Sequence, residues 1–246
     1  MGQTTVQGLI IHLARAVERA DHVAGLIETF PCPAVALDAV DARTLTPEDR
    51  ARYTAVSTWR PRYPFPLNDT EIAVFLSHRA AWARIAEGEA TAGLIVEDDV
   101  ELETGVFDRA YALATQYLTE DSWIRLPWKP RETPRSVVAE ADGARLFWPR
   151  RVALGMQGQI VGRRAARRLL AATETFDRPV DTFLQMTWVT GECPMVVMPA
   201  GIWDVSYRMG GTTLTKRKPA LAERLSTEAK RAWFRGALAV TAQLRG

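Results

Sequence analysis

Three consecutive carboxylates, Glu97, Asp98 and Asp99, directly follow the apolar run Ala92–Val96. Adjacent carboxylates repel one another, so a fold gains little from them unless a cation lies between them. Hard oxygen ligands suit Mg²⁺ or Mn²⁺, and these ions commonly keep substrate phosphates as further ligands. In an extended segment Glu97 and Asp99 point to one side and Asp98 to the other. The triplet predicts either a divalent-metal site, with Asp99 as the leading ligand and Glu97 as its partner, or a solvated acidic turn.

A metal at this position would serve the departure of a diphosphate, because the bound cation neutralises the charge that develops on the leaving group. Two classes of enzyme use that chemistry: those that release a nucleoside diphosphate, and the nucleotidyl or phosphoryl transferases. The sequence has no phosphate-binding loop of the form GxxxxGK(S/T), which counts against the second class. Release of pyrophosphate in place of a nucleoside diphosphate would favour it.

A separate carboxylate, Asp181, follows Pro179-Val180 and precedes Thr182. A transfer to a hydroxyl group needs one carboxylate to accept the proton of the attacking hydroxyl. Asp181 is the candidate for this general base. The same position also suits a helix N-cap, which is the structural alternative.

Glu71 and His78 stand seven residues apart within a helix that we expect over Asp69–Glu87, so both lie on one stripe of that helix. Ser77 lies off this stripe. Glu71 and His78 either face a substrate, as candidate catalytic residues, or His78 is a histidine at the edge of the core whose ring is satisfied by the backbone.

The elements that must position these residues form an α/β pattern. We expect strands over Gln7–Leu13 and Pro33–Val40, separated by a helix over Ala16–Phe30, which gives a parallel sheet. Two further runs flank Asp142-Gly143, a strong hairpin signal that makes the sheet mixed, though mostly parallel. Ligands of such sheets bind beyond the carboxyl ends of the strands. The acidic triplet follows directly on such an end.

The composition fits one large α/β domain with a short appendage, because the 246 residues are 47% hydrophobic and 24% charged. No apolar run has the length of a membrane span, and the first residues lack the pattern of a secretory signal. Cys32 and Cys193 are the two cysteines, too few for a zinc cluster or a disulfide framework. We therefore expect a reduced, cytoplasmic protein.

The C-terminal segment is basic. Residues 208–246 carry nine basic and two acidic side chains, a net charge of +7 that leaves −5 for the remainder. We expect a domain over 1–210 and a basic helical extension over 211–246, with a helix from Pro219 to Leu244. This helix either lies on an anionic membrane surface or packs on the domain. Nucleic-acid binding is not expected, because no basic platform with interleaved aromatic residues is present.

Several motifs occur together in a specific order. They are Ile10-Ile11-His12-Leu13 with Arg15 and Arg19, Ala39-Val40-Asp41-Ala42, Leu67–Ile72, Leu76-Ser77-His78, Trp82, Leu94–Val100, Gly155–Ala166 and Pro179-Val180-Asp181. They are similar to the patterns INLDRSxxR, AVDG, LTxGEIGCxLSHxxxW, ILEDDV, GTxAYxxSxxGA and PVD. The sequence therefore resembles glycosyltransferase family 25, the bacterial lipooligosaccharide galactosyltransferases and their collagen-modifying relatives.

The resemblance implies a GT-A-like nucleotide-binding fold, a UDP-sugar donor, Mn²⁺ or Mg²⁺, and inversion at the anomeric carbon. Galactose is the family's commonest donor sugar, and the acceptor is a glycan such as lipooligosaccharide or lipopolysaccharide, which can be lipid-linked. The residues assigned to the donor are His12, Leu13, Arg15, Arg19, Ser77, Glu97 and Asp98.

The sequence also departs from the family pattern. His12 and Ala14 replace Asn and Asp, Ala73 replaces a glycine, and Gln159 and Gly162 replace Tyr and Ser. These changes support an alternative hypothesis, in which the protein is a catalytically inactive homologue that binds a nucleotide sugar or a glycan. We expect acceptor choice to reside in the segments Trp59–Pro66 and Lys129–Pro134.

Overall fold

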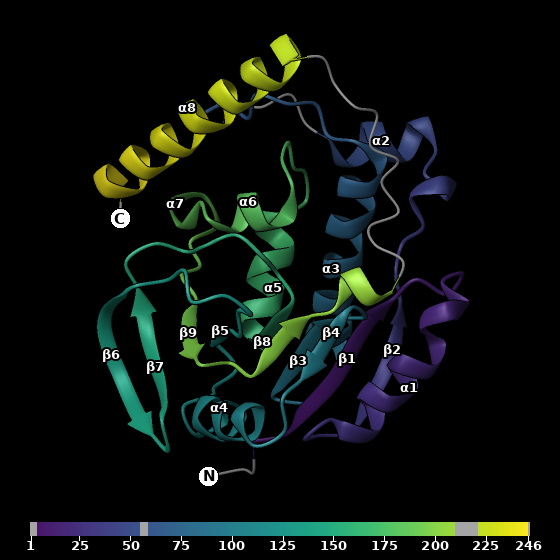
Figure 1. Cartoon of the computed structure of the whole chain (residues 1–246), viewed down its shortest axis with the longest axis vertical. Helices are drawn as coiled ribbons and strands as arrows, with labels where there is room; N and C mark the ends of the chain where they lie inside the picture. The colour runs from purple at the N-terminus through teal and green to yellow at the C-terminus, as the bar shows by residue number, and fades with distance from the viewer. Residues whose placement is uncertain (1–3, 55–58, 210–220, 246) are drawn as a thin grey trace.

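The computed structural model describes residues 4–54, 59–209 and 221–245. An eight-stranded sheet runs through it with helices on both faces (Figure 1). Its strands, in spatial order, are β2 (Ala34–Asp38), β1 (Val6–His12), β3 (Ala92–Glu97), β8 (Gly158–Gly162), β5 (Trp123–Arg125), β9 (Met195–Met198), β7 (Ala144–Pro149) and β6 (Pro134–Ala141). The pairings make β7 and β8 run against the other six strands. The predicted α/β class with a mixed, mostly parallel sheet is confirmed.

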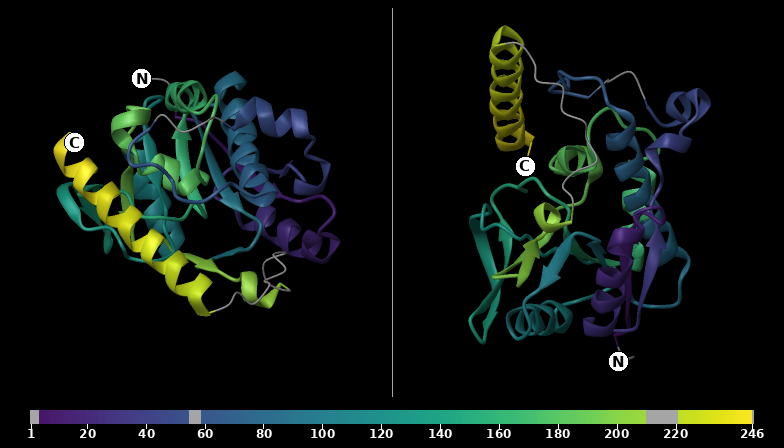
Figure 2. Two further views of the ribbon diagram at one scale, coloured as in Figure 1. Left: turned by 90° about the horizontal axis from the view of Figure 1, so that it is seen from above. Right: turned by 45° about the vertical axis from the view of Figure 1, so that its right-hand side comes forward.

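Alternate residues of the central strands enter two cores, as the pleat of a strand requires. On β1, Leu9 and Ile11 pack on one side of the sheet and Ile10 on the other. The first core is covered by α3 (Asp69–Glu87), α5 (Arg163–Ala172) and α6 (Val180–Leu184), and the second by α1 (Ala20–Thr29) and α4 (Val106–Gln116). Figures 1 and 2 show these two layers. The remaining described helices are α2 (Pro47–Tyr53) and α7 (Thr187–Thr190), with 3₁₀ turns at Val17–Arg19, Ala42–Thr44 and Ser206–Arg208, and the C-terminal helix taken up below.

Helix α3, which carries several candidate site residues, has the predicted bounds because its ends are encoded locally. The side chain of Asn68 accepts from the backbone N–H of Glu71, and the Glu71 carboxylate accepts from the Asn68 N–H, both at 2.9 Å. Such a capping box satisfies two backbone donors that the first turn leaves unpaired. Gly88 follows the last helical residue.

The two-stranded ribbon that sequence reasoning missed lies beside the acidic triplet. Strand β4 (Val100–Leu102) pairs antiparallel with β10 (Ile202–Asp204), so that Asp204 lies opposite Val100. Each strand has three residues, which is too short for a period-two pattern to stand out. The ribbon nevertheless brings a fourth acid next to the triplet.

The C-terminal helix α8 (Leu221–Arg245) packs on the domain. Phe234 and Leu238 are buried in a small cluster with Met186, and Trp59, Tyr63, Trp188 and Val189 border that cluster. Figure 1 shows α8 lying across the end of the domain that carries α6 and α7. The predicted boundary at residues 210 and 211, and three of the tail's basic residues, Lys216, Arg217 and Lys218, lie outside the described residues. None of the described helices is both long and apolar enough to cross a membrane.

Candidate active site

A cavity of about 640 Å³ opens at the carboxyl ends of β1 and β3. The loop after β1 contributes Leu13, Arg15 and Arg19 to its lining, α3 contributes Ser77 and His78, and β3 with its following turn contributes Glu97, Asp98 and Asp99. The two strands are adjacent and parallel, so their ends meet at one edge of the sheet. Residues separated by more than 80 positions in the sequence thus line one site, to which we refer as the donor cavity.

Asp98 joins the ends of the two strands. One carboxylate oxygen lies 2.8 Å from His12 Nδ1, and the other accepts from Arg19 Nη1 at 2.6 Å. Asp98 is buried, with 7% of its surface exposed. These contacts favour the structural role for Asp98 over a ribose contact, and they contradict the alternative of a solvated acidic turn at this residue. His12 is not part of the cavity lining, and it contacts that lining through Asp98.

Within the described part of the chain, Asp99 and Glu97 are the carboxylates of the triplet that lack an Arg or Lys partner of their own. Burial raises the pKa of Asp99 to about 7, and the nearby charges of Glu97, Asp98 and Asp204 add to the rise. Three carboxylates, those of Glu97, Asp98 and Asp204, act on Asp99 against the guanidinium of Arg19. Hard oxygen donors face the cavity here, so the residues fit a Mg²⁺ or Mn²⁺ ion.

No group of three or more Asp, Glu, His or Cys side chains within the described ranges is arranged to hold a metal without help. Mg²⁺ is typically bound by only one or two carboxylates together with substrate phosphates. Glu97 and Asp99 form such a pair of carboxylates in this cavity.

Ser77 and Arg15 line the cavity but also hold the surrounding loops. The Ser77 hydroxyl donates to the Ala73 carbonyl at 2.7 Å and accepts from the Val40 N–H at 2.9 Å, which ties α3 to the loop after β2. Arg15 Nε donates to Asp41 at 2.8 Å. The Arg15 side chain remains about one third exposed, so its guanidinium is open to an anionic ligand.

Asp181 and Glu71 do not line the donor cavity. Asp181 Oδ2 accepts from the Gly155 N–H at 3.2 Å, while the N-cap of α6 is Pro179, which makes no side-chain capping bond. The N-cap interpretation of Asp181 is therefore wrong. Burial raises the pKa of Glu71, and the charge of Asp181 adds to the rise. Burial likewise raises the pKa of Tyr63 to about 12, with both acids contributing. The charge of Asp181 is therefore felt by Glu71 at the N-terminal end of α3.

Sequence reasoning missed four residues near these groups. Asp204 is the last residue of β10, and its charge raises the pKa of Asp99. Arg208 and Met209 follow β10 and line the donor cavity. The fourth, Arg125, is buried and donates to the Gly155 carbonyl at 2.5 Å, next to the N–H that Asp181 uses. The only sequence signal for Asp204 and Arg125 was a charged residue at the end of a short strand.

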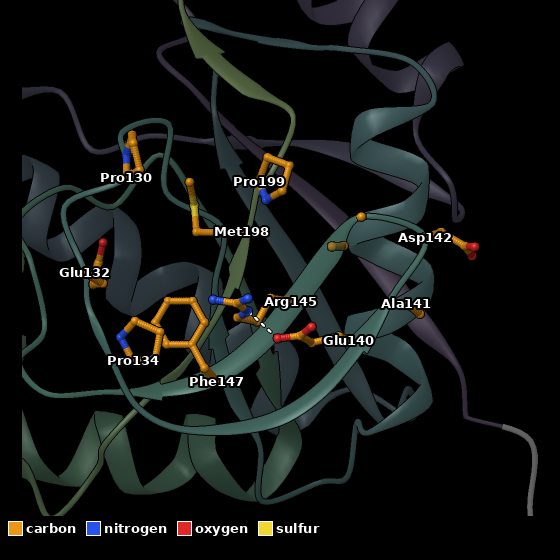
Figure 3. Close-up of a pocket in the computed structure, with 12 residues that line it drawn as sticks. Pro130, Glu132, Pro134, Glu140, Ala141, Asp142, Arg145, Phe147, Met198 and Pro199 are labelled. Carbon is orange, nitrogen blue, oxygen red and sulfur yellow. Dashed lines mark ion pairs between the residues drawn. The ribbon is translucent and has the colours of Figure 1, made fainter.

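A second cavity of about 720 Å³ lies beside the β6–β7 hairpin and shares none of its lining residues with the donor cavity. Figure 3 shows the Arg145–Glu140 ion pair in this cavity, together with Phe147, Met198 and Pro199. Phe147 is only 2% exposed, so it offers no aromatic face on which a sugar could stack. The acidic triplet lies in the other cavity, to which we therefore assign the chemistry.

The acidic cavity lies beyond the carboxyl ends of the strands, where α/β sheets of this kind bind their ligands. The family model of glycosyltransferase family 25, described as LPS biosynthesis protein, matches residues 6–184. The chain belongs to glycosyltransferase family 25 and is a glycosyltransferase.

Curated proteins include none that matches this chain. Among solved structures, the galactosyltransferase LgtC in complex with donor and acceptor sugar analogues is 13% identical, with 72% of this chain and 69% of that chain covered and a TM-score of 0.34. An active-site mutant of LgtC is 14% identical, with 72% and 68% covered and a TM-score of 0.32. Likenesses this distant do not bear on the donor, the acceptor or the mechanism.

Proposed function

We propose that this chain is a metal-dependent, inverting glycosyltransferase that moves a sugar, with galactose favoured, from a UDP-sugar to a glycan such as lipooligosaccharide or lipopolysaccharide. One observation carries the proposal: Glu97 and Asp99, two carboxylates without an Arg or Lys partner among the described residues, share the donor cavity with the open guanidinium of Arg15. A diphosphate is bound by a divalent cation and by paired hydrogen-bond donors such as those of a guanidinium. Glu97 and Asp99 can hold the cation, and Arg15 supplies the hydrogen-bond donors.

At the donor end, Glu97 and Asp99 would hold Mn²⁺ or Mg²⁺, which when bound supplies Lewis-acid stabilisation of the diphosphate leaving group. Arg15 binds phosphate oxygens through its planar guanidinium. Arg19 pairs with Asp98 and so fixes one side of the cavity, while Arg15 contacts the diphosphate. Leu13 and Val40 give the nucleoside an apolar surface against which to pack.

At the acceptor end, Asp181 accepts the proton of the attacking hydroxyl. Its two oxygens are oriented by the Gly155 N–H at 3.2 Å and the Thr182 hydroxyl at 3.3 Å. Glu71 is the second candidate, because its raised pKa brings it closer to the working pH, where a general base is most effective. Inversion follows because the base and the leaving group act on opposite faces of the sugar.

The test is nucleoside diphosphate release from a panel of UDP-sugars with Mn²⁺, with and without a glycan acceptor. Stabilisation of several kcal/mol by the cation predicts that Asp99→Asn lowers release at least about 100-fold. Glu140→Gln is the control, because Glu140 is an exposed acid on the β6–β7 hairpin and does not line the donor cavity. A chelator should abolish the wild-type activity.

Two other results would each replace the proposal. UDP-sugar that protects the fold against heat without release or transfer would indicate the inactive binding homologue. Release of pyrophosphate would indicate a nucleotidyl transferase.

We propose further that α8 gives this enzyme peripheral contact with an anionic membrane at the cytoplasmic face, where a lipid-linked acceptor lies. Trp233, Val240 and Leu244 are spaced seven and four residues apart, so they form one stripe, and they are 59%, 55% and 80% exposed. Lys230, three residues before Trp233, is exposed on the same side of the helix. An exposed apolar stripe with a basic residue beside it suits an anionic lipid surface.

Vesicle co-sedimentation tests this contact. We expect binding to vesicles that contain phosphatidylglycerol, weaker binding at high salt, and loss of binding in Trp233→Ala. Tyr117, an exposed aromatic residue directly after α4, provides the control, and Tyr117→Ala should bind as the wild type does. Equal binding of wild type and Trp233→Ala would contradict the proposal.

A further inference from the structure

A continuous hydrogen-bond chain runs through the core to the donor cavity. Trp123 Nε1 on β5 donates to Gln159 Oε1 on β8 at 3.0 Å, and Gln159 Nε2 lies 3.3 Å from His78 Nδ1 on α3. His78 Nε2 lies 3.4 Å from Glu97 Oε1 at the end of β3. The first three residues are 2%, 0% and 1% exposed, so water does not compete for these groups.

The chain has one direction, because its first member can only donate. An indole N–H is a donor without an acceptor site, so Gln159 must present its carbonyl oxygen to Trp123. The amide NH₂ of Gln159 is then turned toward His78 Nδ1, which must accept. The ring proton of the neutral imidazole therefore resides on Nε2, and this N–H donates to Glu97.

We propose that His78 is a positioning residue that holds the Glu97 carboxylate in place, and that Trp123 and Gln159 fix the His78 tautomer required for it. The inference rests on the proposed function, since it takes Glu97 as an acid that holds the cation. It gives a role to Gln159, which stands where the family pattern has a tyrosine.

The arrangement around Glu97 shows why such an anchor matters. The Glu97 side chain is 28% exposed toward the cavity, and His78 holds one of its oxygens. A free glutamate loses rotamer entropy when a ligand orders it. An anchored carboxylate has already lost part of that freedom, so the cation is bound with less ordering at the moment of binding. Groups that orient metal ligands typically change metal affinity or activity about 10- to 100-fold when they are removed.

The tautomer is tested by ¹⁵N-histidine NMR on the full chain without metal or donor. The protein has three histidines, so the spectrum is simple, and His78→Gln assigns the signal. We expect the wild type to show the Nε2–H pattern for His78. Gln159→Leu removes the amide donor and should give a mixed pattern. Gln159→Glu presents an acceptor of the same size on that side, so Nδ1 should also carry a proton and the ring should show the pattern of an imidazolium.

The positioning role is tested by Mn²⁺ affinity, from the electron paramagnetic resonance of free Mn²⁺, and by kcat and KM for the UDP-sugar. We expect Gln159→Leu and His78→Leu to weaken Mn²⁺ binding about 10- to 100-fold. His78→Gln should recover most of the affinity, because the glutamine amide can donate from the position of Nε2. His22→Gln is the matched control, since His22 contacts the Val100 carbonyl.

Each outcome separates this inference from the proposed function. An Nδ1–H pattern in the wild type would overturn the direction of the chain, whether or not the protein transfers sugar. The expected tautomer with unchanged Mn²⁺ affinity and kinetics in Gln159→Leu would remove the positioning role and leave the glycosyltransferase intact. If His78→Gln bound Mn²⁺ no more tightly than His78→Leu, the role of His78 would be packing alone. A wild type that shows the Nε2–H pattern but neither binds Mn²⁺ nor releases nucleoside diphosphate would overturn the metal-dependent function and the role of Glu97 with it.

Discussion

The buried ion pair between Arg125 and Glu132 allows the effect of one substitution on stability to be predicted. The two side chains are 2% and 0% exposed, and Arg125 Nη1 donates to Glu132 Oε1 at 2.5 Å. The same oxygen accepts from the Ala153 N–H at 3.3 Å. Glu132→Gln keeps the size of the side chain and removes its charge, so the guanidinium remains buried without this counterion.

Breaking a buried pair in this way costs about 3–5 kcal/mol, because the remaining charge is desolvated and uncompensated. For a chain of this length, each kcal/mol lowers Tm by roughly 2–4 °C, so we expect a fall of about 6–20 °C. Glu140→Gln is the matched control, since Glu140 pairs with Arg145 on the adjacent hairpin with both side chains about half exposed. Exposed pairs contribute roughly 0–1 kcal/mol, so this variant should lose no more than about 4 °C.

Calorimetry gives Tm and urea unfolding gives the free energy of unfolding for Glu132→Gln and Glu140→Gln. The double variant Arg125→Met with Glu132→Met should be more stable than Glu132→Gln, because it leaves no unpaired charge at this place in the interior. We also expect kcat to fall in Glu132→Gln, since Arg125 holds the Gly155 carbonyl and the Gly155 N–H holds Asp181. A loss of stability in Glu132→Gln no larger than in Glu140→Gln would refute the reasoning.

Three further predictions concern packing and charge. A Cβ at Gly162 would lie 2.4 Å from a backbone oxygen of the α4–β5 loop, so Gly162→Ala should lower the free energy of unfolding by about 1–3 kcal/mol. A Cβ at Gly236 meets open space, so Gly236→Ala should raise it by about 0.5–1 kcal/mol. Urea unfolding measures both changes. Phe234→Ala should remove hydrogen-exchange protection from α8 alone, because the buried ring anchors that helix; loss of protection throughout the sheet would contradict this. The raised pKa of Glu71 means that the folded state binds a proton more tightly than the unfolded chain, so stability falls as pH rises from the ordinary glutamate pKa through the raised one. Glu71→Gln should remove that slope and make the protein more stable than the wild type at pH 7; an unchanged pH profile would show that Asp181 and burial do not act on this residue.

Most of the fold could be predicted because its signals are local. The capping pair Asn68 and Glu71 set the start of α3, and Asp142-Gly143, with φ angles of 49° and 81°, made the predicted hairpin turn. The short strands β4 and β10 were missed because three residues carry no readable period. The gathering of candidate donor residues at one strand edge was also predictable, since parallel strands end together.

The roles of individual residues could not be read from the chain, because they depend on partners brought in by folding. Asp98 and Asp99 are adjacent and of one type, yet Asp98 lies between His12 and Arg19, while Asp99 lies among other acids. The sequence presented His78 as one histidine on a helix, and only the sheet placed Gln159 behind it.

The sequence by itself determined the class of the fold, the family and the strand edge at which the acids gather, because capping, strand periodicity and motif order are properties of neighbouring residues. The tertiary structure alone decided which acid is neutralised and which lies among other acids, and which side of the histidine ring carries the proton. Hydrogen bonds and charge interactions act over a few ångströms in space, and the residues that make them here are separated by 19 to 86 positions along the chain.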